Sequence, residues 1–147
     1  MVAGIMALFA LTIVSVFLST LRGGSKAQLL QILHQDGDFA LERMVVMVRN
    51  SLEADCSSDL TITNSDGLTT SFTLETDNSV DKIASNSSEF LTGEVANVSL
   101  LSFSCYDGYL GNQVVTISFT MTAGKATDQA QEKFTQGFAT SVSTRQY

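Results

Sequence analysis

Basic residues are scarce in this chain. Of its 147 residues, 8 are lysine or arginine and 15 are aspartate or glutamate, which gives a net charge of −7. A surface of this charge repels phosphate groups, so it argues against binding to nucleic acid or to anionic lipid. The length allows one domain with a real core and argues against two.

Histidine is almost absent, since His34 is the only one. A catalytic triad or a histidine-based metal site would need it, yet it lies in the middle of a predicted helix. The Asp-Gly-Asp triplet at 36–38 lacks the alternating oxygen ligands of an EF-hand loop. Asp107 and Asn112 suit calcium or, more often, a plain turn. We therefore expect no enzymatic activity, no cofactor and no metal.

Charged residues are missing altogether from residues 1–21. As a helix, this run would extend about 31 Å, close to the hydrocarbon thickness of a bilayer. We therefore predict a transmembrane helix over residues 1–21. A cleavable signal peptide is the alternative, although the run exceeds the usual core of roughly 7 to 15 apolar residues and follows no basic segment.

The residues after this segment give conflicting indications of its orientation. Arg22 and Lys26 follow it, which by the positive-inside rule would keep the rest of the chain in the cytoplasm. Two cysteines, Cys56 and Cys105, and a second half rich in Ser, Thr and Asn instead suit a location outside the reducing cytosol. The conflict disappears if further residues precede Met1, so we expect a longer N-terminus and an extracytoplasmic head.

Apolar residues continue at helical spacing to about residue 55. They are Leu29, Leu30, Leu33, Leu41, Met44, Val45, Val48 and Leu52. Residues 22–55 are therefore predicted to form an amphipathic helix. Gly23 and Gly24 lie where the uncharged segment ends, and each glycine lowers helix stability by about 1 kcal/mol relative to alanine. Residues 1–55 then form one long helix, or two segments with a hinge at this glycine pair.

After Cys56 the apolar pattern changes to alternation, which is typical of strands. The predicted strands begin at residue 60 and cover 68–75, 80–84, 95–106 with a bulge at 100–101, 115–121 and 138–144. Residues 125–133 are predicted to be a polar connection. Only the helix stripe at 41–52 is available to cover the apolar face of these strands. The predicted fold class is α+β: a long N-terminal helix, transmembrane in one half and amphipathic in the other, packed on a small antiparallel β-sheet made by residues 56–147.

Cys56 falls at the predicted end of the helix, and Cys105 falls near the end of the strand over 95–106. A disulfide between them would tie the helix end to the sheet. It requires Cα atoms about 4.4 to 6.8 Å apart. Two free buried cysteines are the alternative.

Four features together resemble one family. They are an apolar helix that continues as an amphipathic one, the motifs Gln-Leu-Leu-Gln at 28–31 and Phe-Ala-Leu-Glu-Arg-Met at 39–44, a small sheet rich in Ser and Thr, and a final strand at 142–147. They resemble the type IV pilin and pseudopilin superfamily, in particular its minor members. The family's basic leader and its early Glu are not present: residues 2–5 look like the sequence just after that Glu, and no carboxylate precedes Asp36. Either the chain starts further upstream, or this is a subunit that lacks the Glu.

The resemblance implies a structural subunit, a minor pilin or pseudopilin, that assembles through its N-terminal helix into a pilus-like or secretion filament. Ala10, Val14 and Phe17 would face inner-membrane lipid before assembly and other pilin subunits afterwards. The implied localisation is a single-pass inner membrane protein with an extracytoplasmic head, then a cell-surface or periplasmic filament. The alternative is a membrane-anchored binding module that forms no filament, and an anchored enzyme is a third reading.

Overall fold

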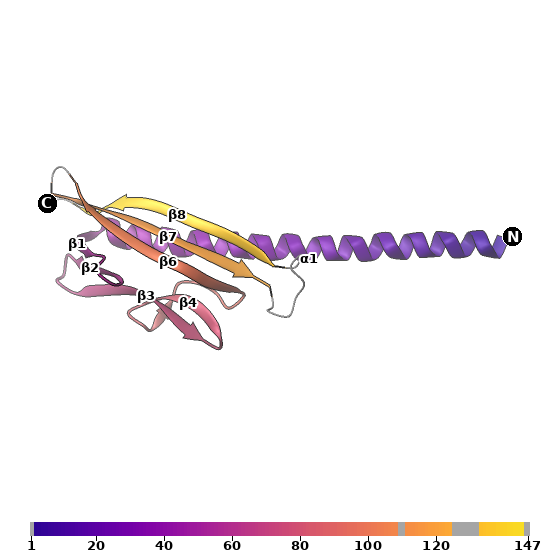
Figure 1. Cartoon of the computed structure of the whole chain (residues 1–147), viewed down its shortest axis with the longest axis horizontal. Coiled ribbons are helices and arrows are strands. Elements are labelled where there is room, and N and C mark those ends of the chain that lie inside the picture. Colours follow the sequence, from indigo (N-terminus) through magenta and orange to yellow (C-terminus); the bar gives the residue numbers. More distant parts are fainter. Residues whose placement is uncertain (1, 109–110, 125–132, 146–147) are drawn as a thin grey trace.

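The computed structural model describes residues 2–108, 111–124 and 133–145, with side chains in the first half of the helix given at positions 4, 6, 9–20 and from 26 onwards. Helix α1 (Val2–Arg49) comes first and eight strands follow it. The strands are β1 (Ser51–Asp55), β2 (Leu60–Asn64), β3 (Thr69–Asp77), β4 (Val80–Ser85), β5 (Glu89–Phe90), β6 (Ala96–Asp107), β7 (Gln113–Ala123) and β8 (Phe134–Ser143). The C-terminal half of α1 lies along the strands, and its N-terminal half extends beyond them (Figure 1).

The strands form two antiparallel sheets. The first has the order β1-β2-β3-β4-β5 and the second has the order β6-β7-β8, so consecutive strands pair within each sheet and the chain passes between the sheets after β5. The predicted hairpin is present, because β2 and β3 pair across a turn closed by a hydrogen bond from the Gly67 amide to the Asn64 carbonyl, 3.0 Å long. The predicted bulge in β6 is also present, since the register with β7 shifts between Ser99 and Ser102 and Leu100 has a φ of 53°.

The predicted fold class is wrong, because the described chain is predominantly β and has two sheets instead of one small sheet. The reason lies at β5, which ends the first sheet with two residues and pairs with β4 only at Ala84 and Ser85. Beyond β5, the Leu91 amide donates to the Ile83 carbonyl (2.8 Å) and the Thr92 hydroxyl accepts from the Ile83 amide (3.1 Å). So short an edge strand offers few backbone groups to a further strand, and β6 pairs with β7 in a second sheet.

The predicted transmembrane half is wrong as well. Within the part of the chain that the structure describes, no helix has the length and apolar character needed to cross a membrane. The predicted localisation as a single-pass inner membrane protein is wrong on the same ground.

Helix α1 ends at Arg49, before the predicted end at residue 55. The Ser51 hydroxyl donates to the Val48 carbonyl (2.7 Å), which satisfies one of the carbonyl groups left free at the helix end. The next residues pair with β2, in a register that places Ala54 opposite Ile62. Cross-strand pairing therefore overrides the helical spacing that included Leu52.

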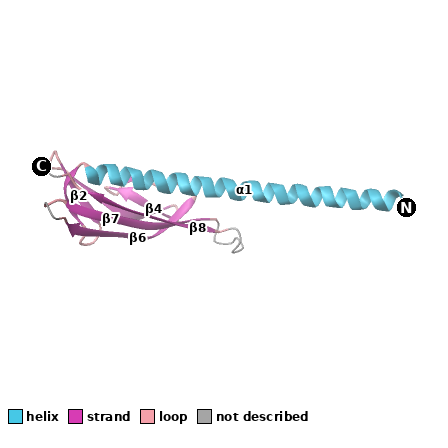
Figure 2. Cartoon of the chain, turned by 90° about the horizontal axis from the view of Figure 1, so that it is seen from above, coloured by secondary structure: helices cyan, strands magenta, loops and turns pink. Residues whose placement is uncertain are grey.

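The core lies between α1 and the two sheets, and the first sheet contributes Leu60, Ile62, Phe72 and Ile83 to it. The buried helix side chains are Leu33, Ala40, Met44 and Val48. Opposite them, β7 buries Val115, Ile117, Phe119 and Met121 in strict alternation, as predicted. Figure 2 shows α1 running along one side of the strands. The predicted polar connection at 125–133 falls almost wholly on residues 125–132, which lie outside the described residues.

Candidate interaction surfaces

The N-terminal part of α1 presents apolar side chains to solvent on every side. Phe9, Ile13 and Phe17 are 65%, 67% and 63% exposed, and every described side chain from 9 to 20 is exposed. Successive residues of a helix point about 100° apart, so such a run leaves no polar face. In both overview pictures this half of α1 lies clear of the strands (Figures 1 and 2). We call residues 9–20 the stem.

Three of the four hydroxyl groups of the stem form hydrogen bonds within the helix. Thr12, Ser15 and Thr20 donate to backbone carbonyls three or four residues earlier, at distances of 2.8, 2.8 and 2.9 Å. Their oxygen atoms are thereby satisfied within the helix. The outer surface of the stem therefore consists mainly of hydrocarbon.

The sequence-predicted residues of this region fall on α1. Ala10, Val14 and Phe17 are all exposed and, being four and three residues apart, share one face of the helix. Gly23 and Gly24 lie inside α1, which continues through them as a single helix. Of the two arrangements predicted for residues 1–55, the structure has the unbroken one up to Arg49.

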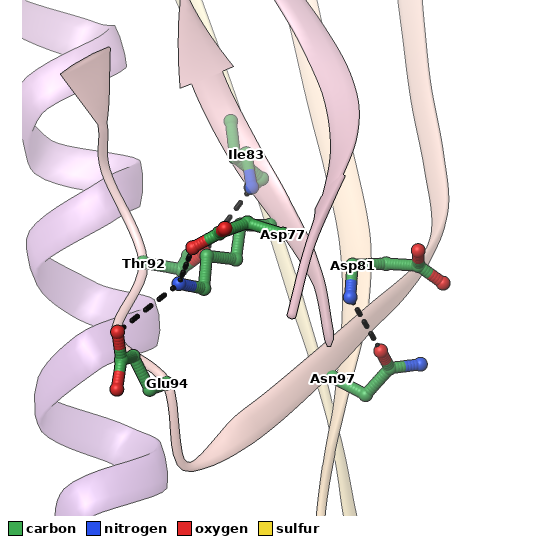
Figure 3. Close-up of polar contacts among 7 residues, drawn as sticks. Asp77, Asp81, Ile83, Thr92, Glu94 and Asn97 are labelled. Atoms are coloured by element: carbon green, nitrogen blue, oxygen red, sulfur yellow. Dashed lines mark hydrogen bonds and ion pairs between the residues drawn. The ribbon is translucent and has the colours of Figure 1, made fainter. Parts of the chain in front are cut away.

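The second feature is a cluster of charged side chains around Lys82 on β4. The ammonium of Lys82 lies 2.7 Å from an Asp77 carboxylate oxygen and 3.6 Å from a Glu94 oxygen (Figure 3). It also lies 4.9 Å from the centre of the Phe90 ring. The residue is 3% exposed. The hydrogen bond to Asp77 is the main cause that raises the pKa of Lys82 above its ordinary value of 10.5.

The charges and burial of this cluster favour a structural role over a catalytic one. A lysine whose pKa is raised stays protonated at neutral pH, so it does not serve as a base or a nucleophile. Instead, Lys82 joins the end of β3 to the loop that leaves β5, where Glu94 lies. Sequence reasoning missed it, because β4 is buried on both faces from Lys82 to Ser85 and its residues do not alternate between apolar and polar.

Cys56 and Cys105 form a disulfide, with their Cα atoms 5.7 Å apart. The bridge has a different structural role from the predicted one. Cys56 follows β1 and not the helix, and Cys105 lies in β6. The disulfide therefore joins the first sheet to the second.

The residues considered for catalysis or metal binding are not brought together. His34 is exposed and meets the edge of the Phe138 ring, with ring centres 6.2 Å apart. Within the described ranges, no three His, Cys, Asp or Glu side chains are grouped as a metal ion would require. Between Asp107 and Asn112, the Gly108 amide donates to the Asn112 carbonyl (2.6 Å), which closes a turn.

Comparison with known proteins assigns no family. A scan against protein-family models, a search of curated proteins and a search of solved structures each returned no match. The pilin resemblance therefore stays a prediction from the sequence, and the function is argued from the surfaces themselves.

Proposed function

We propose that this protein is a structural subunit that assembles with copies of itself or with similar subunits through the stem of α1, as a minor pilin or pseudopilin does in a filament. The observation that carries the proposal is the apolar stem. A helix that is hydrophobic all round belongs in an apolar environment, because leaving it in water costs about 25 cal/mol for each Å² of apolar surface. Neighbouring helices of the same kind would supply that environment along its whole circumference.

The arrangement of the chain fits this role. The strands pack only on the C-terminal half of α1, so the stem is free to pack with other helices while the sheets remain outside. Val14 and Phe17, on one face of the stem, would pack between the side chains of a neighbouring helix. The head needs no catalytic group for this function.

The experiment compares charge substitutions at two places on one helix. Val14→Asp and Ala10→Asp place a carboxylate on the stem, whereas Gln31→Asp places it at an exposed position beside the head. A buried unpaired charge costs several kcal/mol, so the stem variants should lose assembly and the Gln31→Asp control should keep it. Assembly is measured by sedimentation and by electron microscopy of the full chain. Stem variants that assemble like the unaltered protein would contradict the proposal.

A further inference from the structure

Among the described strands, β8 has the one long regular edge with which no other strand pairs. Only beyond its end, at Arg145, does an outward amide meet another strand, since it donates to the Ser51 carbonyl of β1 (3.2 Å). β8 is the outermost strand of the second sheet and pairs with β7 over ten consecutive residues without a register shift. Figure 1 shows it at the margin of the molecule. It contains no charged residue, no proline and no bulge, which are the usual features that keep an exposed edge from pairing.

The other edges carry such features. β5 has two residues, and β1 has five with a bulge between Ser51 and Glu53. At the far edge of the second sheet, β6 is bulged, and its Asn97 side chain accepts a hydrogen bond from the Asp81 amide of β4 (Figure 3). β8 is the exception among these four edges.

The hydrogen bonds at the end of β8 identify the backbone groups that point outward. The Thr144 amide donates to the Gln113 carbonyl of β7 (2.8 Å), so residues at even positions of β8 face β7. Those at odd positions face away, and they are Thr135, Gly137, Ala139, Ser141 and Ser143. All of them have small side chains, which let another backbone approach. The outward carbonyl of Gly137 is met only by the neighbouring Gln136 amide group, at 3.1 Å.

Helix α1 presents two apolar side chains, Leu41 and Val45, beside this edge, and we call them the α1 shelf. His34 touches Phe138 of β8, and Leu41 and Val45 follow on the same flank of the helix, seven and eleven residues later. Both are half-buried against the core. A strand added outside β8 would lay alternate side chains against Leu41 and Val45 and complete their burial.

We propose that the outer edge of β8 binds an extended peptide segment of another protein, which adds to the second sheet as an antiparallel strand. The segment is uncharged and alternates apolar with small polar residues, so that its apolar side chains lie on the α1 shelf. Backbone hydrogen bonds to the odd positions of β8 supply the affinity, and the shelf supplies the selectivity.

A second copy of β8 suits this edge less well. It would bring its own α1 over the same face of the joined sheet, where the first α1 already packs, and both copies carry a charge of −7. A peptide without a helix over it meets neither obstacle. The inference is independent of the proposed assembly through the stem.

The experiment uses the full chain and, as probe, a synthetic peptide with the sequence of residues 113–123. This is the sequence of β7, the strand with which β8 already pairs, and it alternates apolar and small polar residues. Hydrogen exchange is measured residue by residue with and without peptide. We expect the odd amides of β8 to exchange roughly tenfold more slowly with peptide, and the even amides to stay unchanged because β7 already holds them. Unchanged odd amides would overturn the proposal.

Two variants sharpen the result. Ala139→Pro removes one outward amide and leaves the bonds to β7 intact, and proline is tolerated at such an edge position. It should weaken peptide binding by roughly tenfold, whereas Ala139→Val, which keeps the amide, should not.

If Ala139→Pro does not fold, the exchange pattern of the unaltered protein tests the proposal alone. Protection of the odd amides that needs no peptide and rises with protein concentration would overturn the proposal in favour of a second copy. Val14→Asp should bind the peptide normally, so failure of stem assembly and failure of this inference are distinguishable.

Discussion

The ring of Phe138 lies directly on Gly37, so that a methyl group at that glycine would overlap the ring atoms. Gly37 is buried in the C-terminal half of α1, and Phe138 in turn stacks on Phe119 of β7, with ring centres 5.2 Å apart. The absence of a side chain at Gly37 thus sets how closely the helix approaches the second sheet. In the sequence, this glycine stood out only as the middle residue of the Asp-Gly-Asp triplet at 36–38.

Gly37→Ala should destabilise the fold, although alanine has a higher helix propensity than glycine. Propensity favours alanine by about 1 kcal/mol, but overpacking in a filled core costs about 1 to 3 kcal/mol. Denaturant unfolding measures the difference. Gly4→Ala is the matched control, since nothing lies near that position and only propensity acts there. Combining Gly37→Ala with Phe138→Leu should recover part of the loss, and a Gly37→Ala variant more stable than the unaltered protein would show that the contact is not a constraint.

Reduction of the Cys56–Cys105 bridge should lower the free energy of unfolding by about 4 kcal/mol. The cysteines are 49 residues apart. The chain-entropy estimate for a loop of this size gives about that value. The measurement is the denaturant midpoint with and without reductant. A variant with both Cys56→Ser and Cys105→Ser should be insensitive to reductant, and an unaltered protein equally insensitive would mean that the bridge adds no stability.

Stability should fall at alkaline pH because of Lys82. The bond to Asp77 raises the pKa of Lys82 above 10.5 in the folded state. Its contribution is therefore complete below about pH 10.5 and is lost as the pH rises through the folded-state pKa. Thermal unfolding at about pH 9 and about pH 11.5 measures the loss. Lys82→Met should reduce this pH dependence, whereas Lys133→Met, at an exposed lysine, should leave it as it is. Equal slopes in all three proteins would contradict the assignment.

Replacing both Gly23 and Gly24 by alanine should stiffen α1 where the stem joins the head. Two glycines lower helix stability by about 2 kcal/mol in sum. We expect slower amide exchange in residues 26–32 of the double variant, and weaker assembly if the pair acts as the predicted hinge. Exchange rates equal to those of the unaltered protein would leave the glycines without a role in helix flexibility.

Much of the local structure followed from residue pattern alone. The alternation of Val115, Ile117, Phe119 and Met121 predicted a strand buried on one face, because side chains of a strand point alternately to its two faces. The slip of that alternation near Leu100 predicted the bulge. The pairing of the only two cysteines was predicted as well. Ala10, Val14 and Phe17 are exposed on a helix, and the uncharged apolar run at residues 1–21 had predicted that helix.

What the sequence by itself determined is therefore local: which segments are helical or extended, and which of their faces are apolar. The tertiary structure decided how these segments combine. The first sheet ends at the two-residue strand β5 and β6 pairs with β7 instead, which divides the strands into two sheets. Ser51–Asp55 pair with β2 as β1, although their spacing continues the helical pattern. The tertiary structure likewise decided the close approach at Gly37 and left the edge of β8 without a neighbouring strand. Each depends on contacts between residues far apart in the chain, and a periodic pattern carries no information about which distant segment will supply the partner.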